Sequence, residues 1–234
     1  MGTRIVTFPV TMMFGTIEDT VYPSLLLDDR QMILVDCGYI GALPVVEHEL
    51  QKLGVSLGQL TGLVITHHDH DHMGAAAALR RANPAITVYA SVQETPYITA
   101  TEKPLRLLQA EALQKSLPPE QQAFGQAFCD MLRTVEPVTV DVEVTDGMHR
   151  DWCGGCTLIQ TPGHTPGHLS LYLEHESVVI TGDAFALENG KPVIANPQFT
   201  LNRELAEVSM EKLLNLHANT YFCYHGGVYL PAKT

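Results

Sequence analysis

The chain has 234 residues, of which 45% are hydrophobic, and its formal net charge at pH 7 is −12. This length suits a single domain over 1–234 with a sizeable core, built from two similar halves. The acidic balance argues against nucleic acid and anionic membrane surfaces as partners, no apolar run is long enough to span a bilayer, and the N-terminus lacks a signal-peptide pattern.

The first half begins with short strands and an amphipathic helix. Runs rich in apolar and β-branched residues at 4–8, 22–27 and 31–36 predict an antiparallel meander. Apolar residues at helical spacing then predict a helix over 43–53, and Gly54 ends it.

The densest cluster of chemically active side chains follows at 66–74, in the order Thr-His-His-Asp-His-Asp-His-Met-Gly. An apolar strand at 62–65 precedes it and a small-residue helix at 75–82 follows, so the cluster occupies a loop at the carboxyl end of a strand, where α/β sheets bind ligands. Two carboxylates packed among imidazoles repel each other unless a cation is present, and both groups are metal ligands. The loop therefore predicts a metal site.

A strand at 84–90 leads into residues 92–135, whose apolar residues suggest two helices broken at Pro118 and Pro119. One interpretation is a lid or pocket wall over an active site, and the other is a plain core-packing hairpin. If it is a lid, deleting 104–133 should change the substrate range and spare the metal content.

The second half repeats a pattern in which a strand ends in a ligand-type residue on a tight loop. The predicted strands are 138–144, 157–161, 169–173, 178–182 and 221–224, and a helix capped by Asn202 spans 204–216. His164 lies between two of these strands, Asp183 follows a third, and His225 follows the last. The repetition favours one shared metal site over unrelated turns.

These motifs resemble those of the metallo-β-lactamase-fold metallo-hydrolase superfamily, whose first motif is T-H-x-H-x-D-H-x-G. The matching residues are Thr66, His67, Asp71, His72 and Gly74, while Asp69 stands where most members have His. The chain is similar to the T-H-H-D-x-D-H-x-G variant found among uncharacterised bacterial members. The resemblance covers nearly the whole length and implies an α+β fold, a four-layer αββα sandwich of two mixed or antiparallel sheets with helices outside.

The resemblance also implies a ligand set for two divalent metal ions. His67, Asp69 and His164 would hold one ion; Asp71, His72 and His225 would hold the second, and Asp183 would bridge them. Zinc is the expected metal, although the harder oxygen of Asp69 shifts the preference toward iron or manganese. A metal-bridging hydroxide would attack the substrate, with Asp71 orienting it and relaying its proton.

The expected reaction is hydrolysis of a small ester, lactone or thioester. Ala186 stands where the lactonase branch has Tyr, and only nine residues follow His225, where the glyoxalase II branch has a helical extension. Two alternatives stay open. One is an iron-dependent oxidoreductase of the persulfide dioxygenase or flavodiiron type, and the other is a non-catalytic metal-binding module.

Several residues around the motifs have supporting or structural interpretations. In the family the residue at the Asp36 position supports the metal loop from below, and a strand-end cap is the alternative for it. His68 and His70 are expected to lie near the ligands without binding metal, and His168 is expected to orient His164 or pack beneath it. The remaining histidines are expected at the surface, namely His48, His149, His175 and His217.

The five cysteines point to a reducing, cytoplasmic setting. Cys37, Cys129 and Cys223 are interpreted as core thiols. Cys153 and Cys156 follow Trp152 in a W-C-x-x-C pattern, but a strand follows where a redox motif needs a helix. Their redox chemistry and the oligomeric state, with a homodimer as one option, are left open.

Overall fold

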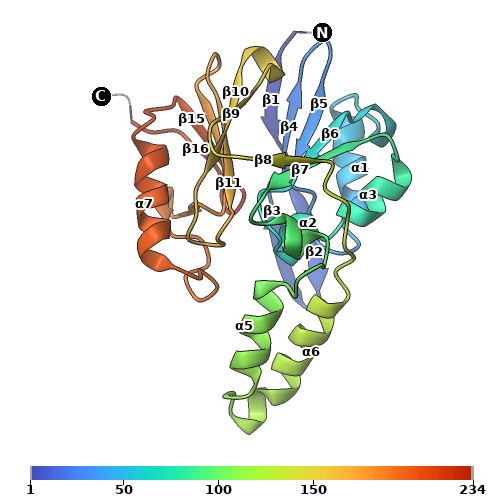
Figure 1. The fold of residues 1–234 in the computed structure, drawn as a ribbon, viewed down its shortest axis with the longest axis vertical. Helices are drawn as coiled ribbons and strands as arrows, with labels where there is room; N and C mark the ends of the chain where they lie inside the picture. The colour runs from blue at the N-terminus through green and yellow to red at the C-terminus, as the bar shows by residue number, and fades with distance from the viewer. Residues whose placement is uncertain (1, 233–234) are drawn as a thin grey trace.

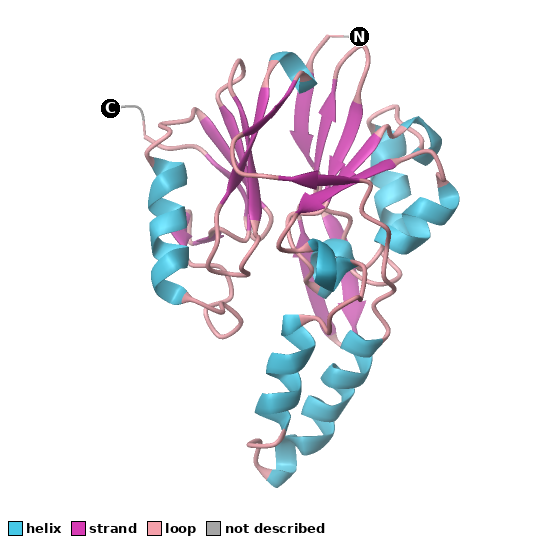
Figure 2. Cartoon of the chain, viewed as in Figure 1, coloured by secondary structure: helices cyan, strands magenta, loops and turns pink. Residues whose placement is uncertain are grey.

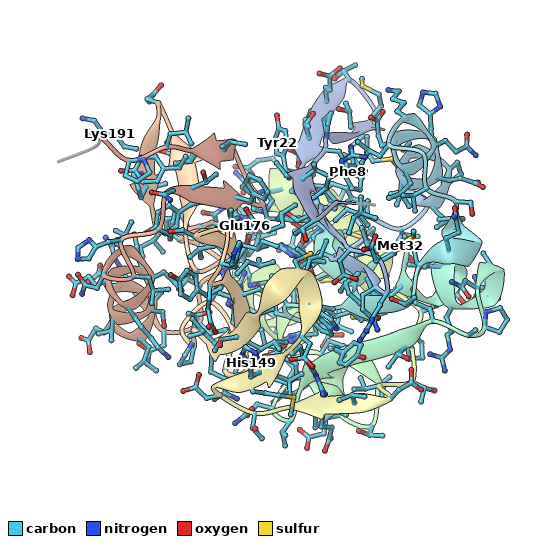
Figure 3. All side chains as sticks on the ribbon, turned by 90° about the horizontal axis from the view of Figure 1, so that it is seen from above. Phe8, Tyr22, Met32, His149, Glu176 and Lys191 are labelled. Atoms are coloured by element: carbon cyan, nitrogen blue, oxygen red, sulfur yellow. The ribbon has the colours of Figure 1, made fainter. Side chains whose placement is uncertain are left out.

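The computed structural model describes residues 2–232 and has four layers, with two facing β-sheets and helices on both outer sides (Figure 1). This confirms the α+β sandwich that the motifs implied. Figure 2 shows a pair of helices projecting beyond one edge of the sandwich, and Figure 3 shows the two sheets from above, with helices beyond each. No helix in the described part of the chain is long and apolar enough to cross a membrane.

The first sheet has the strand order β1-β4-β5-β6-β7-β8. The bounds are β1 Arg4–Thr7, β4 Ser24–Leu27, β5 Met32–Val35, β6 Gly62–Val64, β7 Thr87–Ser91 and β8 Val142–Val144. The pairs β1·β4 and β4·β5 are antiparallel, and β5 to β8 run parallel. Parallel strands need both faces covered, which explains the continuous apolar sequences of β5 and β6.

The second sheet has the strand order β16-β15-β12-β11-β10-β9. The bounds are β9 Met148–Arg150, β10 Cys156–Gln160, β11 Leu169–Leu173, β12 Val178–Gly182, β15 Thr220–Cys223 and β16 Gly227–Tyr229. The pair β12·β15 is parallel, and the other neighbours are antiparallel.

Two small hairpins and the helices complete the chain. The hairpins are β2 Val10–Phe14 with β3 Ile17–Val21, and β13 Ala186–Glu188 with β14 Lys191–Val193. The α-helices are α1 Leu43–Lys52, α2 His70–Met73, α3 Ala76–Ala82, α4 Thr95–Ile98, α5 Leu105–Gln114, α6 Gln122–Arg133 and α7 Arg203–Leu214. The 3₁₀ turns are η1 Leu57–Gln59, η2 Pro119–Gln121 and η3 Trp152–Gly154.

Successive core side chains of a strand point to opposite faces of its sheet. On β5, Ile33 and Val35 join the cluster between the sheets, while Leu34 joins the cluster under α1 and α3. On the second sheet, Val179 and Tyr221 pack with Leu213 of α7. This two-residue alternation is the physical reason that both sheets can be covered on both faces.

Most predicted elements are present, one predicted strand needs correction, and one hairpin near the N-terminus was missed. The strand predicted over 138–144 is reduced to Val142–Val144, because the Val138 N–H donates to the Ile98 carbonyl in a loop instead of to a strand. The hairpin of β2 and β3 was not predicted as strands. Its sequence mixes polar and apolar residues, and its tip is exposed at Met13, Phe14 and Ile17.

The cysteine interpretations fit the structure where it tests them. All five cysteines are buried and free. β10 begins at Cys156, so the helix that a redox motif needs is absent there. Burial raises the pKa of the Cys153 thiol to about 11, with the charge of Asp28 adding to the shift, and raises the pKa of Cys156 as well. Thiols held in the neutral form are poor nucleophiles.

Candidate metal centre

The loop after β6 is held in place by Asp36. Its Oδ1 accepts from the Thr66 backbone N–H at 2.8 Å, and its Oδ2 accepts from the Thr66 hydroxyl at 2.8 Å. The same Oδ2 lies 2.8 Å from His72 Nδ1. When Nδ1–H donates to Asp36, Nε2 of His72 keeps its lone pair and faces the cluster. Asp36 therefore supports the loop from below, which settles the two interpretations of this residue.

The ligand-type side chains meet at one edge of the sandwich because the strands that carry them end there. β5 and β6 run parallel in the first sheet, and β12 and β15 run parallel in the second. Parallel strands place their carboxyl ends at the same edge. Asp183 follows β12, His225 follows β15, and His164 comes from the loop between β10 and β11.

The structure brings all seven predicted ligands together. Their ligand atoms form three overlapping triads, within each of which the atoms lie inside 4.8 Å of one another: His67–Asp69–His164, His67–His72–Asp183 and Asp71–His72–His225. Six of these residues are buried, and His225 is the most open, with 19% of its side chain exposed.

Asp183 faces both ends of the cluster. Its Oδ2 lies 3.4 Å from His164 Nε2, and its Oδ1 lies 3.3 Å from His72 Nε2 and 3.4 Å from His225 Nε2. At one end, Asp69 Oδ2 lies 3.1 Å from His164 Nε2 and 3.5 Å from His67 Nε2. At the other end, Asp71 Oδ2 lies 3.3 Å from His225 Nε2.

The donor atoms fit divalent metal ions. Within the described chain, Nε2 of His67, His72 and His225 and Oδ1 of Asp183 are buried without a hydrogen-bond partner. Buried polar atoms without partners are costly, and these point toward one another. Metal ions would satisfy all of them at once, since neutral imidazole and carboxylate are their ligands.

The electrostatics of the cluster reflect its carboxylates. Burial would raise the pKa of Asp183, but the imidazoles of His225 and His72 outweigh it and hold the pKa well below its usual range. Burial likewise opposes protonation of His225, but Asp183 and Asp71 overcome it and raise its pKa to about 10. The pKa of His72 is also raised, by Asp183 and Asp36 against burial.

Metal binding should therefore release protons. His225 carries a proton near pH 7 in the metal-free chain, because its pKa is raised to about 10. The raised pKa of His72 acts in the same direction, and a metal ion takes only the neutral imidazole. We expect the apparent affinity for zinc to rise as the pH increases from 6 to 8, by up to about tenfold per pH unit for each proton released. Calorimetric titrations in buffers of different ionisation enthalpy count the protons, and a pH-independent affinity would contradict this assignment.

Two further residues belong to the centre, and neither was predicted from the sequence. Glu94 is fully buried; its Oε2 accepts from the His68 backbone N–H at 3.0 Å and its Oε1 from the Gly167 N–H at 2.8 Å. It thus joins the motif loop to the loop of His164. Arg106 of α5 is 4% exposed and donates to both oxygens of Asp69. An acid after a strand and an arginine in a helix carry no local signal for these contacts.

The other histidines lie either beside the ligands or at the surface, as expected. His68 pairs with Glu94 through Nδ1, and His70 Nδ1 lies 3.6 Å from Asp71 Oδ1, so both adjoin the ligands. The ring of His168 packs against that of His164, with 6.4 Å between the ring centres, in keeping with the packing alternative. Its Nε2 accepts the Asp183 N–H at 2.8 Å, a contact that was not predicted.

Gly182 makes that contact possible, because it has a φ of +52° and a Cβ there would lie 2.6 Å from His168 Nε2. The four histidines without motif context are exposed, and Figure 3 labels His149 on the edge strand β9. They are His48, His149, His175 and His217.

A cleft of about 670 Å³ reaches the centre. Asp69, Asp71 and His225 lie at its polar end, and its walls come from α5, α6 and residues 196–199. The apolar wall residues include Leu113, Leu117, Phe124, Phe128 and Phe199. Figure 1 shows α5 and α6 projecting beyond one edge of the sandwich.

Histidines and aspartates gathered at the edge of an αββα sandwich define the class of metallo-β-lactamase-fold proteins. The sequence matches the model of the metallo-β-lactamase superfamily over residues 18–225, so the chain belongs to this superfamily. It is a metal-dependent hydrolase.

Three similar proteins illustrate the relationship. Probable metallo-hydrolase YflN of Bacillus subtilis is 29% identical over 224 residues, which cover 90% of this chain and 81% of that protein. A hydroxyacylglutathione hydrolase of Cereibacter sphaeroides is 26% identical over 70% of this chain, which spans about half of that protein, 48%. The crystal structure of a metallo-β-lactamase family protein from Thermus thermophilus superposes with a TM-score of 0.74 at 23% identity, covering 97% of this chain and 74% of that one.

Proposed function

We propose that this hydrolase is dinuclear and cleaves a small ester, lactone or thioester. The observation that carries the proposal is Asp183, whose two oxygens face separate groups of ligands. His67, Asp69 and His164 would hold one ion, and Asp71, His72 and His225 the other, with zinc as the first choice. Bound ions would lower the pKa of a water molecule toward about 7 and would polarise the scissile carbonyl.

The chain's own residues would orient the reacting groups. Asp71 Oδ2 faces His225 at 3.3 Å, while Oδ1 faces His70 at 3.6 Å, so the carboxylate touches both the cluster and the cleft. Its pKa lies below the usual range, because His72 and His70 outweigh the opposing effect of burial. An ionised carboxylate in this position can accept a proton from the attacking water and pass it to the leaving group.

The cleft supports a neutral, largely apolar substrate. Aliphatic and aromatic side chains form much of its walls beside neutral amides, and Arg106 is the one Lys or Arg among the residues that line it in the described chain. The amides are those of Gln109, Gln114, Gln121, Asn196 and Gln198. Arg106 is already engaged by Asp69 and by the Phe199 carbonyl at 2.6 Å. A substrate with several carboxylates, such as a glutathione thioester, would find no free cation there, so we favour a simple acyl ester, lactone or thioester.

The helices α5 and α6 would then form a wall or lid of the substrate site. Replacing Leu113 by Ala should raise KM for apolar acyl substrates by up to about tenfold and leave bound metal unchanged, because the side chain lines the cleft and is 54% exposed, so its loss costs little packing. Leu108→Ala is the matched control on the same helix, 45% exposed and outside the cleft. Equal KM values for the two variants would argue against α5 as a wall of the substrate site.

A metal analysis of protein purified without chelator, paired with a panel of ester, lactone and thioester substrates, tests the proposed function. Two zinc ions per chain with turnover would support it. Iron with oxygen uptake would support an oxidoreductase instead, an alternative favoured by the three carboxylates of Asp69, Asp71 and Asp183 in the ligand set. Bound metal without turnover of any of these compounds would indicate a binding module.

A further inference from the structure

Asp69 and Arg106 form a buried ion pair inside the candidate metal centre. Arg106 Nη2 lies 2.5 Å from Asp69 Oδ2, and Nε lies 3.1 Å from Oδ1 and 3.0 Å from Oδ2. The side chains are 4% and 6% exposed. Burial at this level is rare for charged residues unless they are paired, and removing one partner leaves the other charge uncompensated.

The same arginine touches a second ligand. Its Nη2 lies 3.3 Å from His164 Nε2, which itself lies 3.1 Å from Asp69 Oδ2. The guanidinium therefore adjoins the triad of His67, Asp69 and His164 directly. An ion held by that triad would lie within a few ångströms of a fixed positive charge.

Arg106 is held by more than Asp69. Nη1 donates to the Phe199 carbonyl at 2.6 Å and to Gln109 Oε1, and the guanidinium carbon lies 4.8 Å from the centre of the Phe199 ring. These contacts fix the cation beside the triad whatever residue stands at 69. Arg106 lies within residues 104–133, so deleting that segment would also remove a contact of the metal loop.

The charges of Asp69 and Arg106 determine how the pair affects the binding of a metal ion. The cluster contains three carboxylates, on Asp69, Asp71 and Asp183, and Arg106 cancels the charge of the one it contacts. Its other effect is repulsion, because a unit charge a few ångströms from a divalent ion changes the binding constant by more than tenfold even at the dielectric constant of water. Asp69 attracts the ion and Arg106 repels it, so the two effects offset each other.

We propose that Asp69 and Arg106 act together as one neutral ligand unit of the first metal subsite, which is the triad of His67, Asp69 and His164. Arg106 is a positioning residue that sets the affinity of this subsite for a divalent ion. The inference rests on the dinuclear centre of the proposed function. It assigns α5 a role in metal binding in addition to its place in the cleft wall.

Zinc titrations against a chromophoric chelator test the proposal without relying on activity. Arg106→Met should lower the zinc dissociation constant of the first subsite by at least about tenfold, whether that subsite is the weaker or the stronger of the two. Asp69→His leaves a neutral ligand beside the guanidinium of Arg106 and should raise the same dissociation constant by at least about tenfold. In the double variant this dissociation constant should return to near its value in the original chain. The dissociation constant of the other subsite should stay the same in all variants.

Two further variants keep the test decisive. Arg106→Lys keeps the charge and should stay near the original affinity, whereas Arg80→Met removes another arginine with two bonds to an aspartate, Asp141, and should change neither constant. If Arg106→Met does not fold, the difference between Asp69→His and the double variant gives the same comparison.

The opposite results are equally informative. Unchanged or weaker zinc binding in Arg106→Met, or Asp69→His binding as tightly as the original chain, would overturn this inference alone. Failure of the original chain to bind zinc would overturn the dinuclear proposal and this inference with it.

Discussion

Asp183→Ala is expected to remove bound metal and to lower turnover by at least about a thousandfold. Its two oxygens are the contacts shared by the two ends of the cluster, at 3.4 Å from His164 and 3.3 Å from His72. Without them, His72 and His225 lose the carboxylate that faces both of their Nε2 atoms. Elemental analysis of the purified variant, together with its rate on the best substrate of the panel, measures both effects.

A surface aspartate provides the control for this change. The side chain of Asp151 is fully exposed, and the structure gives it a single weak contact with His149 at 4.0 Å. Asp151→Ala should therefore keep its metal and its rate. A complete metal complement in Asp183→Ala would show that the cluster is assembled in some other way.

Asp71→Ala is expected to abolish turnover, with a loss of roughly 10²–10⁴-fold from the proton transfer alone. The carboxylate lines the cleft and approaches His225 to 3.3 Å, so the change also removes a ligand of the second subsite. Asp71→Asn, which keeps the shape and loses the charge, separates the two roles when metal content and kcat are measured together. Retained metal with a lost kcat would identify proton transfer as the dominant contribution.

His48→Ala is the matched negative control. His48 is exposed on α1 and lies outside the ligand cluster, so its loss should change neither metal content nor rate. A fully active Asp71→Ala enzyme would contradict the site assignment.

A shared metal site could be predicted because strands ending in ligand-type residues recur along the chain, and strand ends are where α/β sheets bind ligands. The assignment of the seven ligands came from the resemblance to the superfamily, and the structure brings these residues together. The strands themselves could be predicted from short apolar and β-branched runs, whereas the two-sheet sandwich was implied by the resemblance. The short helix α2 inside the motif loop was not anticipated, since four residues are too few for a helical pattern.

The residues around the ligands could not be predicted in this way. Arg106 meets Asp69 across 37 residues, and Glu94 meets His68 across 26. Helical periodicity indicates that a residue faces inward, but it does not identify the side chain that it will meet. The contact of His168 with Asp183 was missed for the same reason, because it depends on how two strands pair and on the glycine before Asp183.

The placement of the ligands on both sheets has a consequence for how long the folded chain resists proteolysis. His67 to His72 extend from the first sheet, whereas His164, Asp183 and His225 extend from the second, and Asp69 and His164 are 95 residues apart. Bound ions would therefore fasten the two halves of the polypeptide to each other as a removable cross-link. By mass action, the supply of free metal would govern how often the halves separate, and starvation for metal would expose the chain to proteases.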